Sequence, residues 1–374
     1  MPVSEVPFAG GALGYWGYDL ARYDHRLPSV AQAGSGVPDM AVGIYNWALV
    51  LDHRQRHACL VSHLADDDTR ATLSRLQAWL ISAAAAPSPT VAPFQVHGEI
   101  TFNMGWPAYR SAFDTIQRLL SAGDCYQVNL ARRFFAPASG DAYTLYRAQR
   151  RLSPAPFSAF LEGADWQVVC ASPERFLQVR QGCVETRPIK GTRPRSDEGE
   201  RDAELARELR NHPKDRAENL MIVDLLRNDL GKCCVPGSVQ AKRLFEIESY
   251  SHVHHLVSTI SGRLRPDQDA LDLLRACFPG GSITGAPKQR AMEIIEQLEP
   301  HRRGVYCGAI GYLGFDGNMD TNIAIRTLVH AGGEICGWAG GGIVADSQCE
   351  AEFRETEDKA AAMLNLLRQF ANAA

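Results

Sequence analysis

The order of strand-like and helix-like segments constrains the fold of this chain more than any other feature of its sequence. Strand-like segments come in runs, at 157–184, 238–264 and 306–338, and helix-like segments interrupt these runs without alternating with single strands. One-for-one alternation builds a doubly wound parallel sheet, whereas unequal blocks favour an α+β fold. The sequence therefore predicts an α+β protein, and we find no internal repeat in it.

Apolar residues recur at helical spacing in several segments. The segment 196–211 carries charges on all sides, which predicts a surface helix. The segment 213–228 has an apolar stripe at Leu220, Val223 and Leu226, which predicts one buried side. Helices are expected at 66–85, 107–122, 142–152, 196–211, 213–228, 287–298 and 350–371.

The sequence of the N-terminal quarter predicts a separate subdomain. The mostly apolar segment 40–51 indicates a buried strand, and 57–63 indicates its partner strand. The segment 83–93 holds three prolines and cannot continue a helix, so we expect a linker there. These features predict a β-rich subdomain with its linker at 1–95 and a larger domain at 96–374.

Charge and hydropathy argue against two classes of partner. The 39 Lys and Arg residues against 43 Asp and Glu give a formal net charge of −4, whereas binders of nucleic acid or anionic membranes carry a basic excess. The longest mostly apolar stretch, 76–86, is too short to cross a bilayer, and 1–11 lacks the pattern of a signal peptide. Ten cysteines without a C-x-x-C pair indicate free thiols. We therefore expect a cytoplasmic protein without a nucleic-acid or membrane partner.

Two glycine-rich segments are candidates for backbone contact with a ligand. In 279–288 (PGGSITGAPK) two residues separate the last glycine from Lys288, so the spacing of a phosphate-binding P-loop fails. A turn that caps the following helix is the plainer interpretation. The run Gly340, Gly341 and Gly342 either forms a bulge or brings backbone amides close to an anion.

Two predicted helices each present a pair of carboxylates on one face. Asp215 and Glu218 are three residues apart, as are Glu352 and Glu355, and Lys359 shares the face of the second pair. Carboxylates without imidazole or thiolate partners suit a hard cation such as Mg²⁺. The alternative is a solvated acidic turn at a helix N-terminus, which the helix dipole favours.

Histidine and arginine residues are the remaining candidates. His252, His254 and His255 do not suit zinc, because strand alternation sends the first two to one face and the third to the other. Arg326 lies in the apolar run 323–328. A buried guanidinium is costly without an anion, so Arg326 either meets an internal carboxylate or binds the carboxylate of a ligand.

These segments form an ordered series along nearly the whole chain. Taken together, they resemble the chorismate-utilising enzymes, the family of the anthranilate, isochorismate and aminodeoxychorismate synthases. The series is 10–19 (GGALGYWGYD), 123–130 (GDCYQVNL), 172–176 (SPERF), 187–192 (RPIKGT), 215–224 (DRAENLMIVD), 279–288 (PGGSITGAPK) and 340–345 (GGGIVA), followed by Glu352-x-x-Glu355.

The resemblance implies a chorismate-binding fold. In that fold antiparallel β-sheets pack as a sandwich with helices outside, which makes 96–374 the catalytic domain. Relatives begin well before the segment at 7–11, so a shortened N-terminal part is expected here.

Two positions separate the reactions of this family. Isochorismate-forming relatives have a water-activating lysine where this chain has Gln127, and anthranilate synthases typically have alanine where it has Lys190. The chain is most similar to the aminodeoxychorismate branch, which replaces the C4 hydroxyl of chorismate by an amino group in 4-aminobenzoate and folate biosynthesis. Anthranilate synthesis, or a non-catalytic truncated homologue, are the alternatives.

The resemblance also assigns roles. Lys190 is the nucleophile that attacks C2 of chorismate and must be neutral, and Glu174 protonates the departing hydroxyl. We expect Arg187, Arg193 and the metal ion to lower the pKa of Lys190. Mg²⁺ is held by Glu218 and Glu355. The substrate-binding residues implied are Arg326, His255, Thr284, Tyr306, Gly340, Gly341, Gly342 and Lys359.

The resemblance implies a partner as well. No segment combines a cysteine nucleophile with a histidine in the way a glutaminase requires. Ammonia is therefore expected from solution or from a glutamine amidotransferase subunit that forms a heterodimer with this chain.

Overall fold

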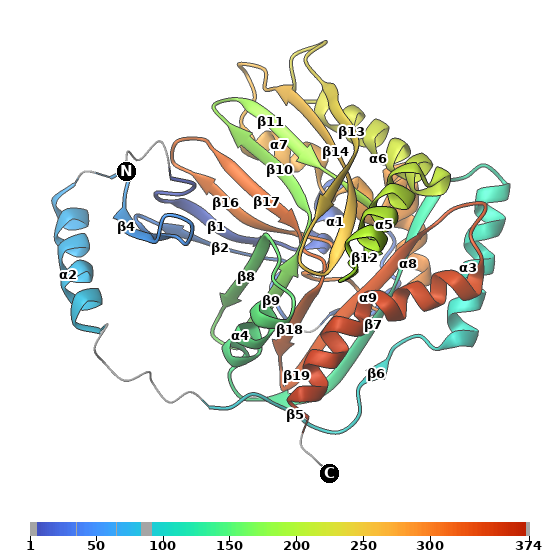
Figure 1. The fold of residues 1–374 in the computed structure, drawn as a ribbon, viewed down its shortest axis with the longest axis horizontal. Helices are drawn as coiled ribbons and strands as arrows, with labels where there is room; N and C mark the ends of the chain where they lie inside the picture. The colour runs from blue at the N-terminus through green and yellow to red at the C-terminus, as the bar shows by residue number, and fades with distance from the viewer. Residues whose placement is uncertain (1–5, 35, 65, 84–91, 372–374) are drawn as a thin grey trace.

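Two large antiparallel sheets make up most of the protein (Figure 1). The structure, a computed structural model, describes residues 6–34, 36–64, 66–83 and 92–371. Its mixture of helices with antiparallel strands confirms the predicted α+β class. The linker predicted at 83–93 falls largely outside the described residues, and the domain division at residue 95 stays a prediction.

The first sheet has nine strands. It includes the N-terminal strands β1 and β2, because β1 pairs with β16 from the C-terminal third of the chain. In order across the sheet, its strands are β12 (Ile189–Pro194), β14 (Val253–Arg263), β11 (Cys183–Arg187), β10 (Arg175–Arg180), β17 (Met319–Ile323), β16 (Ala309–Gly314), β1 (Gly11–Trp16) and β2 (Met40–Tyr45), with β13 (Gln240–Ser249) paired to β14.

The second sheet has eight strands and is built around the long strand β7. In order, its strands are β15 (Gly285–Ala286), β7 (Gln127–Ser139), β19 (Glu334–Ile343), β18 (Thr327–Ala331), β9 (Trp166–Ser172) and β8 (Phe157–Glu162), with β5 (Gln95–Val96) and β6 (Thr101–Phe102) also paired to β7. A separate hairpin joins β3 (Ala48–Asp52) to β4 (His57–Val61).

Helices pack on these sheets. They are α1 (Ala21–Asp24), α2 (Asp67–Ala83), α3 (Trp106–Ser121), α4 (Ala142–Leu152), α5 (Gly199–Asn211), α6 (Pro213–Gly231), α7 (Ala270–Cys277), α8 (Lys288–Leu298) and α9 (Cys349–Gln369), with 3-10 turns η2 (Tyr18–Leu20) and η3 (Gly281–Ile283). No helix in the described ranges is long and apolar enough to span a bilayer.

Side chains of both sheets meet in one apolar core, as the predicted sandwich requires. Leu177 and Met319 from the first sheet and Cys170 and Val329 from the second belong to it, together with Ile222 of α6. The other face of the second sheet packs against α4 and α9 in a second core, and α3 and α8 cover β7 in a third. Burial of these apolar faces is the main stabilising contribution.

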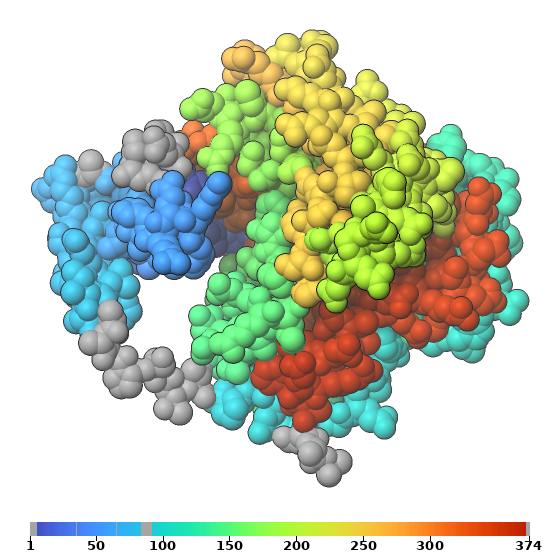
Figure 2. All heavy atoms as spheres, viewed as in Figure 1, coloured from blue at the N-terminus to red at the C-terminus, as the bar shows by residue number. Residues whose placement is uncertain are grey.

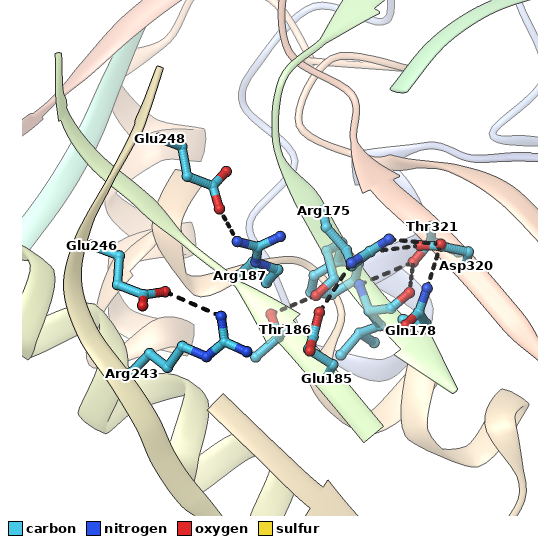
Figure 3. Close-up of polar contacts among 12 residues, drawn as sticks. Arg175, Gln178, Glu185, Thr186, Arg187, Arg243, Glu246, Glu248, Asp320 and Thr321 are labelled. Carbon is cyan, nitrogen blue, oxygen red and sulfur yellow. Dashed lines mark hydrogen bonds and ion pairs between the residues drawn. The ribbon is translucent and has the colours of Figure 1, made fainter. Parts of the chain in front are cut away.

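One face of the nine-stranded sheet carries a set of ion pairs (Figure 3). Arg175 on β10 contacts Glu185 on β11 and Asp320 on β17, both at 3.0 Å, and Arg187 pairs with Glu248 on β13. These contacts link β10 with β11 and β17, and β11 with β13. They lie in the same sheet as β12, which carries Lys190.

Four sequence predictions need correction. The segment 40–51 forms two strands, β2 and β3, and Ile44 is 68% exposed, because β2 is an edge strand and the β3–β4 hairpin lies outside both large sheets. The buried side of α6 is made by Ile222, Val223 and Leu226, whereas Leu220 is 45% exposed. Helix α7 was not predicted.

The fourth correction concerns the run 157–184, which is divided between two sheets. The β8–β9 hairpin belongs to the second sheet and β10 begins the β10–β11 hairpin of the first. The chain crosses between the sheets at Pro173 and Glu174. This crossing places Glu174 where both sheets meet.

Candidate active site

A cavity of about 830 Å³ opens where the two sheets, η3 and the helices α6 and α9 come together. It is lined by Glu174, Lys190, Glu218, Arg326 and Glu355, which come from five separate stretches of sequence. Residues of α5 and α6 lie against α9 on the face shown in Figure 2. The fold thus gathers charged groups that the sequence keeps far apart.

Lys190 points into this cavity from β12. Its Nζ donates a hydrogen bond of 3.2 Å to the carbonyl of Ser282. Burial lowers the pKa of Lys190, and the ammonium of Lys359 lowers it further. The next residue, Gly191, has φ +88°, and a Cβ there would lie 2.9 Å from Cγ of Asp215 on α6. Glycine is needed at 191 for β12 to pass so close to α6.

For the two arginines, the expectation that they lower the pKa of Lys190 was wrong. Arg187 is paired with Glu248 (Figure 3), and Arg193 is paired with Glu208 at 2.9 Å and with Asp215 at 3.3 Å. Carboxylates therefore neutralise both neighbours in sequence. The positive charge that lowers the pKa of Lys190 is the ammonium of Lys359 on α9, far away in the sequence.

Glu174 is the buried acid of the site. It is 5% exposed, and its Oε1 accepts a hydrogen bond of 2.8 Å from the hydroxyl of Ser282. Burial raises the pKa of Glu174, against the opposing effects of Ser282 and Lys190. A carboxyl group with a raised pKa retains its proton closer to neutral pH and can act as a general acid.

Three carboxylates of α6 and α9 face one another across the cavity. Glu218 and Glu352 both lie near Nζ of Lys214, at 3.8 Å and 3.7 Å. Burial raises the pKa of Glu218 and of Glu352. Burial would also raise the pKa of Glu355, but the ammonium groups of Lys359, 2.6 Å away, and of Lys190 and Lys214 together outweigh this effect, and the pKa is lowered.

This donor set fits a hard divalent cation. Glu218 and Glu352 already share one positive group, and carboxylate oxygens are ligands that Mg²⁺ prefers. As the side chains lie, no three His, Cys, Asp or Glu residues in the described part of the chain form a ready metal site. Binding of Mg²⁺ would therefore require Lys214 to move away.

Arg326 is the unpaired cation of the cavity. Its φ is +50°, an uncommon conformation for a residue with a side chain, and such strain is often kept at functional sites. Among the residues that the structure describes, no carboxylate pairs with its guanidinium, and burial alone lowers its pKa. Of the two sequence interpretations, the structure favours a ligand carboxylate over an internal one.

Aromatic and imidazole groups complete the wall near Arg326. Nδ1 of His255 lies 2.9 Å from the hydroxyl of Thr192, and burial together with Arg326 lowers the pKa of His255 to about 4, so its ring is neutral. The ring of Tyr306 stacks on Trp338 with an interplanar angle of 6°. Both residues line the cavity as predicted.

Because directions alternate along a strand, Gly340 and Gly342 of β19 point their backbone amides to one side and Gly341 to the other. The backbone amides of Asn129 and Ala131 on β7 donate away from β19, to Thr284 and Glu299, so their partners Gly342 and Gly340 turn their own amides away from β7. Gly340 and Gly342 line the cavity.

Gly341 faces the other way. A Cβ on it would lie 3.1 Å from Oε2 of Glu352, so it makes room for that carboxylate. The carbonyl of Gly340 accepts a hydrogen bond of 3.0 Å from Lys359. Lys359 is thus held between β19 and Glu355 at the edge of the cavity.

Thr284 and Gly341 are the two expected binding residues that do not line the cavity. The side chain of Thr284 is enclosed by the chain itself. It is fully buried, and its hydroxyl donates to the carbonyl of Gly280 at 3.0 Å. Gln127 is also buried outside the lining, and a Cβ on Gly342 would lie 2.9 Å from its Nε2. Both residues are buried behind those that line the cavity.

Three residues of the site were not named in the sequence predictions of binding or catalytic groups. Ser282 and Asn129 lie inside the quoted segments 279–288 and 123–130, and Lys214 lies in the helix predicted at 213–228, so their segments were found but not their roles. Glu352 was predicted with Glu355 as a carboxylate pair suited to Mg²⁺, although the resemblance assigned only Glu355 as a ligand. The structure places Asn129, Lys214, Ser282 and Glu352 at the cavity.

Comparison with known proteins agrees with the geometry. The family model described as "chorismate binding enzyme" matches residues 2–365. Aminodeoxychorismate synthase component 1 of Klebsiella aerogenes is 52% identical over 366 residues, which are 98% of this chain and 79% of that protein. Anthranilate synthase component 1 of Streptomyces coelicolor is 42% identical, over 97% of this chain and 74% of that protein.

A solved structure shows the same fold. The crystal structure of anthranilate synthase component I from Streptococcus pneumoniae has a TM-score of 0.87 and 34% sequence identity, over 96% of this chain and 81% of that chain.

Proposed function

Since this chain belongs to the chorismate binding enzymes, we propose that it aminates chorismate at C4 with ammonia and so forms 4-amino-4-deoxychorismate. The observation that carries the proposal is Lys190, an amine with a lowered pKa inside the cavity, next to the buried acid Glu174. The 52% identity to an aminodeoxychorismate synthase component 1 supports the same reaction.

Chorismate is a dicarboxylate, and the cavity offers groups for two carboxylates. The guanidinium of Arg326 and the amides of Gly340 and Gly342 receive the enolpyruvyl carboxylate, since they lie together and Arg326 has no carboxylate partner in the described residues. Tyr306 and the neutral His255 form the wall beside it. Thr284 supports the floor.

Glu218, Glu352 and Glu355 would hold Mg²⁺ near the second carboxylate. When bound, the metal ion supplies the positive charge that neutralises the ring carboxylate and withdraws electron density from the ring. Lys214 and Lys359 provide positive charge in the same region. The protein's own contribution is to hold the three carboxylates on two rigid helices.

The first chemical step replaces the C4 hydroxyl by a bond to the enzyme. The lone pair of Lys190 Nζ forms a bond to C2, the ring double bonds shift, and the C4–O bond breaks. Glu174 donates its proton to the departing oxygen, which leaves as water. The lysine must be neutral and the carboxyl protonated, which are the forms that their surroundings favour.

The second step releases the enzyme. Ammonia attacks C4, the double bonds shift back, and the electron pair of the C2–N bond returns to Lys190. The carboxylate of Glu174 accepts the proton that the new ammonium group loses. A glutamine amidotransferase subunit supplies the ammonia in this proposal, consistent with the designation "component 1" of the relative.

Anthranilate synthesis is the second candidate, because an anthranilate synthase component 1 is 42% identical. That reaction also uses chorismate and ammonia but ends with loss of pyruvate. Lys190 argues against it. The collection of Glu174, Lys190, Glu218, Arg326 and Glu355 in one cavity argues against a non-catalytic homologue.

The test is product identification. The purified chain is incubated with chorismate, Mg²⁺ and ammonium chloride, and the product is analysed by mass spectrometry. We expect aminodeoxychorismate from the native chain and from Lys242→Ala, which removes an exposed lysine, and none from Lys190→Ala. Anthranilate as product would favour the second candidate. Full activity of Lys190→Ala would refute the covalent step.

A further inference from the structure

Asn129 on β7 lines the floor of the cavity with an unsatisfied amide. Its side chain is 5% exposed, and its Nδ2 is enclosed without a hydrogen-bond partner among the residues that the structure describes. The enclosed Nδ2 cannot meet a ligand. Oδ1 is not among the enclosed atoms, and no described residue donates a hydrogen bond to it. Because an unpaired polar atom beside a cavity is unfavourable, Oδ1 indicates a ligand that donates a hydrogen bond to it.

The backbone of Asn129 is fixed from two directions. Its N–H donates to the carbonyl of Thr284 at 2.8 Å, and its carbonyl accepts from Arg303 at 2.8 Å. The same guanidinium donates to the carbonyl of Ile283 at 2.8 Å and is paired with Glu299. Asn129 is therefore held rigidly against the loop that follows Gly281.

This loop also holds the proposed catalytic groups. Ser282 accepts the hydrogen bond from Lys190 and donates one to Glu174, one residue before Ile283. On its other side, β7 places Asn129 opposite Gly342 of β19. The backbone of Asn129 thus lies between the loop that contacts Lys190 and Glu174 and the glycines proposed to bind the substrate carboxylate. Gln127 is enclosed behind Gly342, so Asn129 is the β7 amide that reaches the cavity.

The charged groups of the cavity already have partners in the proposed reaction, and Asn129 is neutral. Ammonia has three N–H donors and one lone pair that must remain free for attack. A carboxylate at this position would favour ammonium, whose lone pair is already used. An amide oxygen accepts an N–H without favouring protonation to that extent. Since Nδ2 is enclosed, Oδ1 is the amide atom left to face the cavity.

We propose that Asn129 binds and orients the ammonia that attacks C4, by accepting one of its N–H groups at Oδ1. The inference rests on the proposed function. Ammonia keeps its lone pair for the new C4–N bond, the C2–N bond to Lys190 breaks, and the surplus proton goes to the Glu174 carboxylate. Asn129 exchanges no proton and acts by position.

The test separates the ammonia-dependent step from formation of the enzyme adduct. The dependence of product formation on ammonium chloride is measured at saturating chorismate. The rate of adduct formation is measured by intact-protein mass spectrometry without ammonium. The variant is Asn129→Leu, which keeps the size but not the hydrogen bond, with Asn129→Ser as a second variant of smaller side chain.

We expect the KM for ammonium to rise about 10-fold in Asn129→Leu, the size expected for one lost hydrogen bond. Adduct formation should stay within about twofold. Gln149→Met is the control, because Gln149 on α4 is a buried amide with an unpartnered Oε1 and is not among the residues that line the cavity. Neither quantity should change in this control.

Two results would overturn the inference. One is an ammonium KM that stays within twofold of the native value in both Asn129 variants. The other is an equal loss in adduct formation, which would mean that Asn129 contacts chorismate or only supports the fold. Failure of the proposed function is a different result, since the native chain itself would then form no aminodeoxychorismate.

Discussion

The hydroxyl of Ser282 donates a hydrogen bond of 2.8 Å to Oε1 of Glu174, and both side chains are buried. The bond holds the carboxyl group at the point where the chain crosses between the two sheets. It also stabilises the ionised form of Glu174, so it opposes the effect of burial on its pKa.

Removing this hydroxyl should impair proton donation. In Ser282→Ala the carboxyl of Glu174 loses its orientation and kcat should fall about 10-fold, a typical effect of one misplaced general-acid contact. The pKa of Glu174 should rise further, so the alkaline limb of the rate–pH profile should move to higher pH. Ser282→Thr, which keeps a hydroxyl, should restore part of kcat. An unchanged alkaline limb would argue against the contact in solution.

The charge of Lys359 should set the position of the whole pH profile. Lys190 reacts as the neutral amine, so the rate rises as pH passes through its pKa, and Glu174 reacts as the acid, so the rate falls as pH passes through its pKa. Lys359 lowers both pKa values. In Lys359→Gln both limbs should therefore move to higher pH, whereas Lys359→Arg keeps the charge and should leave both in place. Opposite shifts of the two limbs would contradict this electrostatic account.

In the native chain, the ammonium of Lys214 should weaken the binding of Mg²⁺. Its Nζ lies 3.8 Å from Glu218 and 3.7 Å from Glu352, so a cation entering this site must displace it. Partly exposed ion pairs of this kind contribute up to about 1 kcal/mol, so Lys214→Met should tighten Mg²⁺ binding about two- to fivefold by isothermal titration calorimetry. Lys214→Arg should bind Mg²⁺ as the native chain does. Weaker Mg²⁺ binding by the methionine variant would show that the carboxylates need Lys214 for their positions.

Most helices could be predicted from residue patterns within the helix itself. Helix α4 has the predicted bounds, and α9 begins within one residue of the prediction, because amphipathic spacing and capping residues lie within the helix itself. The buried side of α6 was predicted less accurately, because it includes the polar Asn219. A polar residue on the packed face breaks the apolar stripe that sequence reasoning uses.

The site was predicted as a set of residues but not as an arrangement. The resemblance supplied Glu174 and Lys190, and the apolar run around Arg326 had already singled out that residue. The cavity does bring the three together. The ammonium that acts on Lys190 belongs to Lys359, not to the arginines adjacent in sequence. Such relationships depend on how β12, β19 and α9 pack, and no spacing along the chain encodes them.

The pair between Arg303 and Glu299 should be one of the most stabilising polar contacts. Both side chains are buried, 2.7 Å apart, and the guanidinium also donates to the carbonyls of Ile283 and Asn129. Arg303→Met leaves Glu299 buried without its cation, which should lower the free energy of unfolding by about 3–5 kcal/mol in urea denaturation. Arg290→Met, at an exposed pair, should change it by less than about 1 kcal/mol. Equal effects would mean that water replaces the buried contact.

Arg326 should show opposite effects on stability and on substrate binding. Its guanidinium is desolvated, without a carboxylate partner in the described residues, so Arg326→Met removes a buried charge and should raise the free energy of unfolding by about 1 kcal/mol. The same variant loses the proposed contact with the enolpyruvyl carboxylate, and the KM for chorismate should rise about 100-fold. Arg326→Lys keeps the charge without the planar fork and should raise KM about 10-fold. A methionine variant that unfolds more easily than the native chain would show that Arg326 has an internal partner, and the guanidinium would then be structural.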